Sequence, residues 1–340
     1  MTFTVGISPD FLGSDGNNVW GDIGLSGLDE AGLDWEYMQD RSAALTPAQM
    51  EQYDAILYAA PAVTAASFAG VTNPPLILAR FGVGFDAVDL KACVGAGTVA
   101  TITPDGARGP VATATLTMLL SVLHNTVVKD RLVREQRWDL REGYMGTGLT
   151  GKTIGLLGVG NTGGELVRLL QPFCVRCVGY DPFCPPERAR ELGVELMELE
   201  EVAASCDALI VMAVLTEQTH HIVNAAILNR MKPTAVVINM ARGPIVNEQD
   251  LIAALVSGSI AGAGLDVFEK EPVTNELIGL DNVTLSPHCL SWTDEMSLGN
   301  GSSCVRAIVD VANGRTPEFV INREVLDTAA FKERLALRLS

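Results

Sequence analysis

Three polar side chains in the second half of the chain carry groups that can move protons or bind anions. Arg242 stands in the segment NMARG, Glu271 in LDVFEKEP and His288 in LSPH, and each follows an apolar run that predicts a buried strand. In an open α/β sheet, ligands bind beyond the carboxyl ends of parallel strands. Topology is therefore expected to bring the three side chains together, although they lie far apart in the sequence.

The combination favours chemistry on an acid that also carries an alcohol or a ketone. A histidine can donate a proton to a ketone oxygen and accept it in the reverse direction. A nearby carboxylate such as Glu271 favours the protonated ring. An arginine fork binds a carboxylate through two hydrogen bonds and polarises an adjacent carbonyl. Each residue also has a structural interpretation, with Arg242 in an ion pair, Glu271 solvated at a turn and His288 hydrogen-bonded in a loop.

The chain has only four histidines, which narrows the choice of a proton-transfer residue. His220 and His221, in LTEQTHHIVN, are predicted to lie at the exposed start of a helix. His124 lies in a long helical segment and is interpreted as a core or interface residue. His288 is therefore the predicted general acid/base.

The segment KTIGLLGVGNTGG, residues 152–164, predicts the source of a hydride. Gly158, Gly160 and Gly163 fill the G-x-G-x-x-G spacing where an apolar strand passes into a helix. Gly158 allows the tight turn, Gly160 lets backbone approach a pyrophosphate, and Gly163 lets the helix pack on the strand. Free N–H groups at the start of that helix attract phosphate. The segment therefore predicts a dinucleotide site.

The next apolar run ends at Asp181, about 20 residues further on, where a carboxylate can accept hydrogen bonds from an adenine ribose. A carboxylate at this position repels a ribose 2′-phosphate, and the residues that follow are Pro182 and Phe183 rather than arginine. NAD is therefore predicted rather than NADP. Arg188 and Arg190 leave NADP open as an alternative.

Short apolar runs alternate with helical or irregular stretches along the chain, which predicts an α/β fold with two parallel sheets. A turn-rich segment at 103–110 and one long helix at 111–136 mark a domain crossing. A helix at about 294–313 follows the second sheet and is expected to return to the first domain. The predicted domains are residues 1–104, completed by 291–340, and residues 105–290. The predicted strands are 3–8, 35–38, 54–59, 76–79 and 98–101, then 153–157, 174–179, 208–213, 235–239, 262–266 and 283–285.

Composition limits the partners and the location. Apolar residues make up 48% of 340 residues, enough for two domains with separate cores. The net charge of −17 argues against nucleic acid and anionic membranes as partners. The N-terminus lacks a signal-peptide pattern and no run nears the roughly 20 apolar residues of a membrane span, so a cytoplasmic protein is predicted. Seven scattered cysteines indicate reduced thiols, and no metal site is predicted.

A second glycine-containing turn lies in RFGVGFDAVDL, residues 80–90. Gly82 and Gly84 leave the N–H groups around Val83 accessible, so the turn can hold an anion such as a carboxylate. The alternative is a strand-to-helix turn in which Asp86 or Asp89 caps the helix. The residues alone leave both interpretations open.

The order GVGFDAVDL, GLLGVGNTGGEL, YDPF, LTEQT, NMARGPIVN, GAGLDVFEKEP and SPH resembles the D-isomer-specific 2-hydroxyacid dehydrogenase family over residues 80–288. The resemblance implies a Rossmann-type doubly wound cofactor domain, a smaller flavodoxin-like substrate domain, an active-site cleft between them and a homodimer held by cofactor domains. The implied activity is NAD-dependent hydride transfer that interconverts a D-2-hydroxy acid and its 2-keto acid.

The resemblance also implies residue roles. His288 is the implied general acid/base, Glu271 its partner and Arg242 the ligand of the substrate carboxylate. The backbone of Gly82, Val83 and Gly84 would hold the same carboxylate. The implied cofactor contacts include Asp266 at the nicotinamide carboxamide, and together they are Gly158, Gly160, Asn161, Thr162, Gly163, Asp181, Thr216, Met240, Ala241 and Asp266.

Departures from the family pattern concern substrate choice. Cys289–Trp292 replaces a run of small residues after the histidine, so Trp292 is predicted to shape the substrate pocket or the nicotinamide contact. Val214 and Ala87 replace a common proline and asparagine without removing a catalytic group. Two other functions stay open: an NAD-sensing, co-repressor-like scaffold that retains the same trio, and a formate or phosphite dehydrogenase on the same fold.

Overall fold

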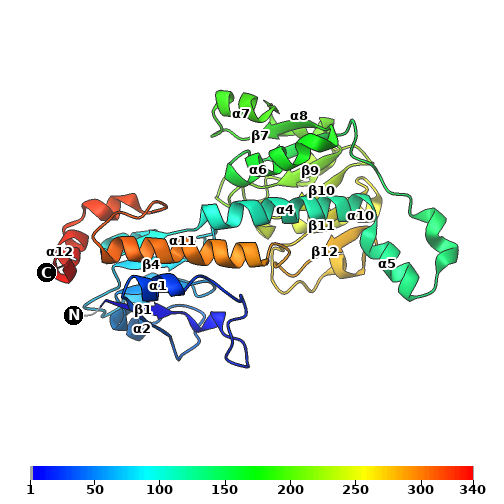
Figure 1. The fold of residues 1–340 in the computed structure, drawn as a ribbon. Helices are drawn as coiled ribbons and strands as arrows, with labels where there is room; N and C mark the ends of the chain where they lie inside the picture. The colour runs from blue at the N-terminus through cyan, green and yellow to red at the C-terminus, as the bar shows by residue number, and fades with distance from the viewer. Residues whose placement is uncertain (1–2, 340) are drawn as a thin grey trace. The chain divides into compact units, whose positions relative to one another are not determined.

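The computed structural model describes residues 3–339. The chain divides into two compact units: unit 1 comprises Met1–Ala107 and Trp292–Ser340, and unit 2 comprises Arg108–Ser291. Each unit contains one parallel sheet flanked by helices (Figure 1). The α/β fold class predicted from the sequence is confirmed.

Unit 1 has a five-stranded sheet in the order β2-β1-β3-β4-β5, which is the flavodoxin-like order. Burial follows position in the sheet: all four residues of β3 are buried, whereas the edge strand β2 alternates between exposed and half-buried residues. The strands are β1 (Thr4–Ile7), β2 (Asp34–Tyr37), β3 (Ala55–Tyr58), β4 (Ile77–Arg80) and β5 (Val99–Thr101), and the helices α1 (Ser26–Glu30), α2 (Pro47–Gln52), α3 (Leu90–Gly95), α11 (Asp294–Ala312) and α12 (Ala329–Leu339).

The C-terminal segment of the chain completes unit 1. Helix α11 begins after Thr293, whose hydroxyl accepts a hydrogen bond from the Met296 N–H, and it buries Ile308 in the core. Further along, the fully buried Asn322 accepts a hydrogen bond from the Ala100 N–H at 2.9 Å and donates one to the Thr98 carbonyl at 2.9 Å. These bonds fix the C-terminal segment to β5.

Unit 2 has a seven-stranded sheet in the order β12-β11-β10-β9-β6-β7-β8. Counted from β6, this is the doubly wound dinucleotide-binding order with one further strand. The strands are β6 (Thr153–Leu157), β7 (Arg176–Tyr180), β8 (Val194–Leu196), β9 (Ala208–Val211), β10 (Val236–Asn239), β11 (Gly262–Leu265) and β12 (Val283–Leu285). The helices are α4 (Pro104–Leu123, whose first turn belongs to unit 1), α5 (Thr126–Arg134), α6 (Asn161–Leu170), α7 (Pro186–Leu192), α8 (Leu199–Ser205), α9 (Ala225–Leu228) and α10 (Glu248–Ser257).

Strand β8 was not predicted from the sequence. It has only three residues, with an exposed Glu195 between Val194 and Leu196, and it pairs with β7 at the edge of the sheet. So short a run, with one charged residue, does not stand out from the surrounding helical pattern. The predicted six-strand count for the second sheet was therefore wrong.

The long helix predicted at 111–136 was also wrong, because the structure has two helices, α4 and α5, bent by 60°. Asn125 takes the left-handed conformation (φ 54°) at the break. Helix α4 begins at Pro104, inside the predicted turn, because proline is tolerated in the first turn of a helix. Gly106 lies in close backbone contact, since a Cβ there would lie 2.3 Å from the Asn300 N. Within residues 3–339, no single helix is long and apolar enough to cross a membrane.

Candidate active site

A histidine–carboxylate pair lies at the carboxyl edge of the unit 2 sheet. His288 follows β12, Glu271 follows β11, and the His288 Nδ1 lies 2.9 Å from the Glu271 Oε2. The other carboxylate oxygen, Oε1, accepts a hydrogen bond from the Phe268 N–H at 3.2 Å. Both side chains remain accessible, at 46% for His288 and 40% for Glu271. Because Nδ1 faces an acceptor, the ring carries its proton there when neutral and leaves Nε2 for a ligand.

The loop that carries His288 is held by Asp266, which lies at the end of β11 and is 3% exposed. Its Oδ1 accepts hydrogen bonds from the N–H groups of Cys289 at 3.1 Å and Leu290 at 3.2 Å. His288 itself takes the left-handed conformation (φ 54°), which is uncommon for a residue other than glycine. The buried carboxylate therefore stabilises a strained loop, a role that the sequence did not reveal for Asp266.

Arg242 follows β10, the neighbour of β11, and its loop is shaped by a buried asparagine that the sequence analysis missed. Asn239 accepts a hydrogen bond from the Ala241 N–H at 3.1 Å and donates one to the Arg242 carbonyl at 3.0 Å. The half-buried guanidinium donates from Nη1 to the Ala241 carbonyl at 2.7 Å. Asn239 stands directly at the strand end in NMARG, and a polar residue ending a buried strand was the available signal. The three predicted catalytic residues thus lie after three adjacent strands, β10, β11 and β12.

Of the three motif glycines in the turn between β6 and α6, only Gly160 has open space beside it, and this is the position that a pyrophosphate is expected to approach. A Cβ on Gly158, at φ +98°, would lie 2.9 Å from the Ala213 N, and one on Gly163 would lie 2.5 Å from the Gly158 carbonyl oxygen. A Cβ on Gly160 would meet nothing within 4 Å. The Gly164 N–H bonds to the Gly160 carbonyl at 2.9 Å, so the earlier N–H groups of Asn161 and Thr162 precede the helical hydrogen bonds. This turn fits a dinucleotide pyrophosphate.

Asp181 lies beside the glycine turn and links it to the end of β7. Its Oδ2 accepts a hydrogen bond from the Val159 N–H at 2.8 Å, and its Oδ1 accepts one from the Phe183 N–H at 2.9 Å. Each oxygen retains lone pairs for a ribose hydroxyl. Arg188 approaches the same turn, with Nη2 at 3.4 Å from the Asn161 Oδ1.

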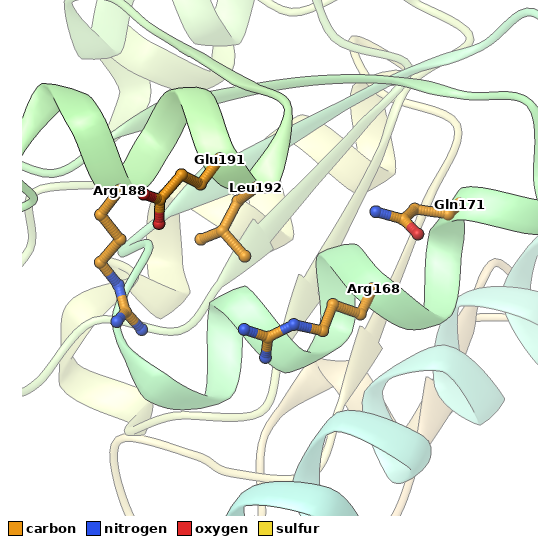
Figure 2. A pocket seen from close by; sticks show the side chains of 5 residues that line it. All are labelled: Arg168, Gln171, Arg188, Glu191 and Leu192. Atoms are coloured by element: carbon orange, nitrogen blue, oxygen red, sulfur yellow. The ribbon is translucent and has the colours of Figure 1, made fainter.

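Arg188 also lines a small pocket of about 110 Å³, which contains none of the predicted catalytic residues. Figure 2 shows its side chains, which extend from α6 and the turn after it and from α7: Arg168, Gln171, Arg188, Glu191 and Leu192. Among residues 3–339, no group of three or more His, Cys, Asp and Glu residues is arranged to hold a metal ion.

The remaining predicted cofactor residues lie after β9 and β10. Thr216 starts a tight turn, in which its N–H donates to the Thr219 Oγ1 at 2.7 Å. Met240 is buried and Ala241 half-buried, both in the turn that Asn239 shapes. These positions lie at the same carboxyl edge of the sheet as the glycine turn.

The Gly82–Gly84 turn belongs to unit 1. Gly82 takes φ +130°, and its N–H donates to the Thr103 Oγ1 at 2.9 Å. The N–H groups of Val83 and Gly84 have no partner within the described residues, so these two can bind an anion. Asp89 caps α3 by accepting a hydrogen bond from the Ala92 N–H at 3.0 Å. Anion binding by the turn and capping of the helix by Asp89 are therefore compatible.

Trp292 also belongs to unit 1, whereas the three catalytic candidates belong to unit 2. Its ring lies 4.1 Å from that of Trp20, and the Trp20 ring lies 4.8 Å from that of Phe81, which precedes the Gly82 turn. Trp292 is 51% exposed. The bulky residue that departs from the family pattern thus packs on the loop between β1 and α1.

The prediction that His221 lies at the exposed start of a helix was wrong. His221 is half-buried in a turn at φ 53°, and its Nε2 lies 2.8 Å from the Glu269 Oε1. The helix, α9, begins only at Ala225, after Asn224 caps it through the Ala226 N–H. The pairing with Glu269, 48 positions away, has no signal in the local sequence.

A doubly wound sheet with a turn that fits a pyrophosphate, and a histidine–carboxylate pair and an arginine at the same edge, define an NAD(P)-dependent dehydrogenase. Residues 116–289 match the family described as D-isomer specific 2-hydroxyacid dehydrogenase, NAD binding domain. A glyoxylate reductase from Thermococcus onnurineus (strain NA1) is 36% identical over 258 residues, which cover 74% of this chain and 77% of that protein.

Two further relatives support the same family. A D-3-phosphoglycerate dehydrogenase from Archaeoglobus fulgidus is 31% identical over 303 residues, covering 88% of this chain and 57% of that protein. The crystal structure of an NADPH-dependent glyoxylate/hydroxypyruvate reductase from Sinorhizobium meliloti, in complex with NADP and malonate, superposes with a TM-score of 0.79 at 29% identity, covering 94% of this chain and 97% of that chain.

The chain belongs to the D-isomer specific 2-hydroxyacid dehydrogenase family. It is an NAD(P)-dependent oxidoreductase that interconverts a 2-hydroxy acid and its 2-keto acid. The family membership and the activity that the sequence motifs implied are confirmed.

Proposed function

We propose that the chain reduces a small 2-keto acid such as glyoxylate or hydroxypyruvate, with His288 as general acid/base. The observation that carries the proposal is the 2.9 Å contact between the His288 Nδ1 and the Glu271 Oε2, at the carboxyl edge of a dinucleotide-binding sheet. The relatives named glyoxylate reductase support the choice of substrate. The proposed direction is reduction, because their names describe it.

Each residue of the trio has a separate task in this proposal. NADH, when bound, supplies the hydride. The His288 Nε2 holds the proton that the ketone oxygen takes up, and Glu271 stabilises the imidazolium through Nδ1. Arg242 binds the substrate carboxylate with its guanidinium fork. The free N–H groups of Val83 and Gly84 bind the carboxylate from unit 1, which we propose as the substrate domain, completed by its C-terminal segment.

The cofactor contacts follow from the glycine turn and the strand ends. We expect the pyrophosphate at the N–H groups of Asn161 and Thr162, and the adenine ribose at Asp181. A carboxylate at 181 favours NAD over NADP, although Arg188 lies close to the same turn. The other expected contacts are Gly158, Gly160, Gly163, Thr216, Met240, Ala241 and Asp266. Titration of the protein with NADH and NADPH, followed by fluorescence, measures this preference.

The side chain of the substrate is proposed to be limited in size by Trp292. Its ring packs on Trp20, which packs on Phe81, so the aromatic column stands next to the Gly82 turn. A packed pair of indole rings leaves less room for a substrate side chain than the small residues common in the family. Small keto acids are therefore the expected substrates.

The chain is further proposed to be cytoplasmic, to form a homodimer and to have no nucleic-acid or membrane partner. The net charge of −17 supports the last point. Exposed apolar side chains on and after α5, among them Val133, Trp138 and Met145, support self-association. Light scattering of the purified protein measures the mass directly.

The test is NADH oxidation with a panel of 2-keto acids graded by side-chain size and charge. The proposal expects turnover that is fastest with the small acids and lost in His288→Ala. NADH binding without turnover on any acid of the panel would favour a scaffold. Reduction of NAD by formate or phosphite would favour the third function.

A further inference from the structure

A second histidine–carboxylate pair joins three loops at the carboxyl edge of the unit 2 sheet. His221 lies in the loop after β9, and Glu269 lies in the loop after β11. The His221 Nε2 is 2.8 Å from the Glu269 Oε1, and both side chains are about one-third exposed (33% and 32%). The pair therefore bridges the loop after β10, which carries Arg242.

The backbone around His221 is fixed to that middle loop. The His221 N–H donates to the Pro244 carbonyl at 2.8 Å. The Val223 N–H donates to the Ile245 carbonyl at 3.2 Å, and the Asn247 N–H donates to the Val223 carbonyl at 2.9 Å. The loop after β9 thus pairs with the segment that directly follows Arg242.

Glu269 is fixed to the middle loop from the other side. Its Oε1 accepts a hydrogen bond from the Glu248 N–H at 2.9 Å, and its own N–H donates to the Glu248 Oε2 at 3.2 Å. The remaining oxygen of Glu248 accepts a hydrogen bond from the Asn275 Nδ2. Glu271 lies only two residues beyond Glu269, so this reciprocal pair also fixes the backbone that carries Glu271.

The two catalytic loops touch at Gly243. A Cβ on Gly243 would lie 1.9 Å from the Phe268 carbonyl carbon and 2.4 Å from the Glu269 N. Such close backbone packing means that Arg242, the preceding residue, moves with the Glu271 loop. The His221–Glu269 pair joins the loops on either side of Arg242 and so stabilises this contact.

We propose that His221 and Glu269 are positioning residues that hold Arg242 in register with the Glu271–His288 pair. The proposal rests on the proposed function of that trio. The pair acts through a hydrogen bond, because the His221 Nδ1 lies 3.5 Å from the Asn247 Nδ2 and accepts from it, which leaves the proton on Nε2. A glutamine at 221 can supply the same donor to Glu269.

The experiment compares His221→Ala, His221→Gln and Glu269→Ala in kcat and KM, with the best keto acid of the panel. We expect kcat/KM to fall about 10- to 100-fold in the two alanine variants, because loss of register misplaces Arg242. His221→Gln should recover most of the loss. The Kd of NADH, measured by fluorescence, should change much less than kcat/KM, since the expected pyrophosphate and adenine-ribose contacts lie elsewhere, at the glycine turn and Asp181. His124→Ala, an exposed histidine just after α4, is the control and should match the wild type.

A double-mutant cycle with Arg242→Ala separates positioning from general stability. If His221 acts through Arg242, His221→Ala should change kcat/KM by less than about twofold once Arg242 is removed. The same fold loss in both backgrounds would overturn the proposal, and so would unchanged kcat/KM in both alanine variants of an active enzyme. If His221→Ala fails to fold, Glu269→Gln takes its place in the cycle. A wild-type protein that turns over no keto acid would instead refute the proposed function, and the positioning role with it.

Discussion

Replacing Gly243 with alanine tests whether the position of Arg242 relative to Glu271 depends on backbone contact between the loops that carry these two residues. The added Cβ would lie 1.9 Å from the Phe268 carbonyl carbon and 2.0 Å from its oxygen. Ordinary van der Waals contact begins at 3.4 Å, so the loops would have to separate by about 1.5 Å. The obstacle is backbone rather than a flexible side chain, so no rotamer change relieves it.

The loops cannot separate freely, because hydrogen bonds hold them on both sides of the contact. The Glu269 N–H bonds to Glu248 at 3.2 Å, and the His221 N–H bonds to Pro244 at 2.8 Å. Overpacking of this kind costs about 3 kcal/mol of folding stability. A displacement of Arg242 by about 1 Å is expected to lower kcat/KM about 100-fold.

Urea denaturation measures the loss of stability, and NADH oxidation with the best keto acid measures kcat/KM. The control is Gly148→Ala, because a Cβ there meets nothing within 4 Å and φ is not positive. It should stay within about 0.5 kcal/mol of the wild type. A Gly243→Ala protein with wild-type stability and turnover would refute the described loop packing. Lower stability with unchanged kcat/KM would instead show that Arg242 is not coupled to this contact.

Three further substitutions test other parts of the structure. Glu271→Gln should lower kcat about 100-fold with unchanged NADH binding, because the amide accepts from His288 but does not stabilise its charge; near-normal kcat would remove the carboxylate from the mechanism. Burial raises the pKa of Asp207, but a β6 backbone N–H and Lys232 outweigh it, so the pKa lies below its ordinary value. Asp207→Asn should therefore cost about 1–2 kcal/mol near pH 7, and the difference in urea denaturation should shrink as the pH falls below about 4, where the unfolded wild type takes up a proton more readily than the folded protein. Trp292→Ala should raise kcat/KM for bulky keto acids relative to glyoxylate, and an unchanged ratio across the panel would exclude the indole from specificity.

The sequence predicted the fold well because both sheets are parallel and their central strands are buried. Runs such as Thr153–Leu157 and Val283–Leu285 are apolar and bounded by turn residues, and they form strands with those bounds. The order of the strands then places every strand-end residue at one edge. This is why Arg242, Glu271 and His288 were predicted as a group without any sequence proximity.

The errors arose where tertiary contacts override local pattern. The break at Asn125 carries no proline or glycine, so the predicted helix ran through it. Pro104 and Gly106 predict a turn from the local sequence, but both lie in α4. Glycine is required at position 106 because the helix packs there against the backbone at Asn300. His221 was predicted to be exposed because its partner, Glu269, lies 48 positions further along the chain. Long-range pairs of this kind leave no local periodicity to detect.

The geometry of the proposed catalytic trio resides in loops rather than in the strands that precede them. Parallel strands bring the loops to one edge, but they do not fix side chains that lie three to six residues further on. That task falls to buried polar groups at the strand ends. Asn239 shapes the turn before Arg242, and Asp266 binds the N–H groups that follow His288. Both are almost fully buried, at 1% and 3% exposed, where an unsatisfied amide or carboxylate would be costly. The loop conformations that satisfy them are therefore strongly favoured, and the backbone that carries Arg242 and His288 is held in place without a bound substrate.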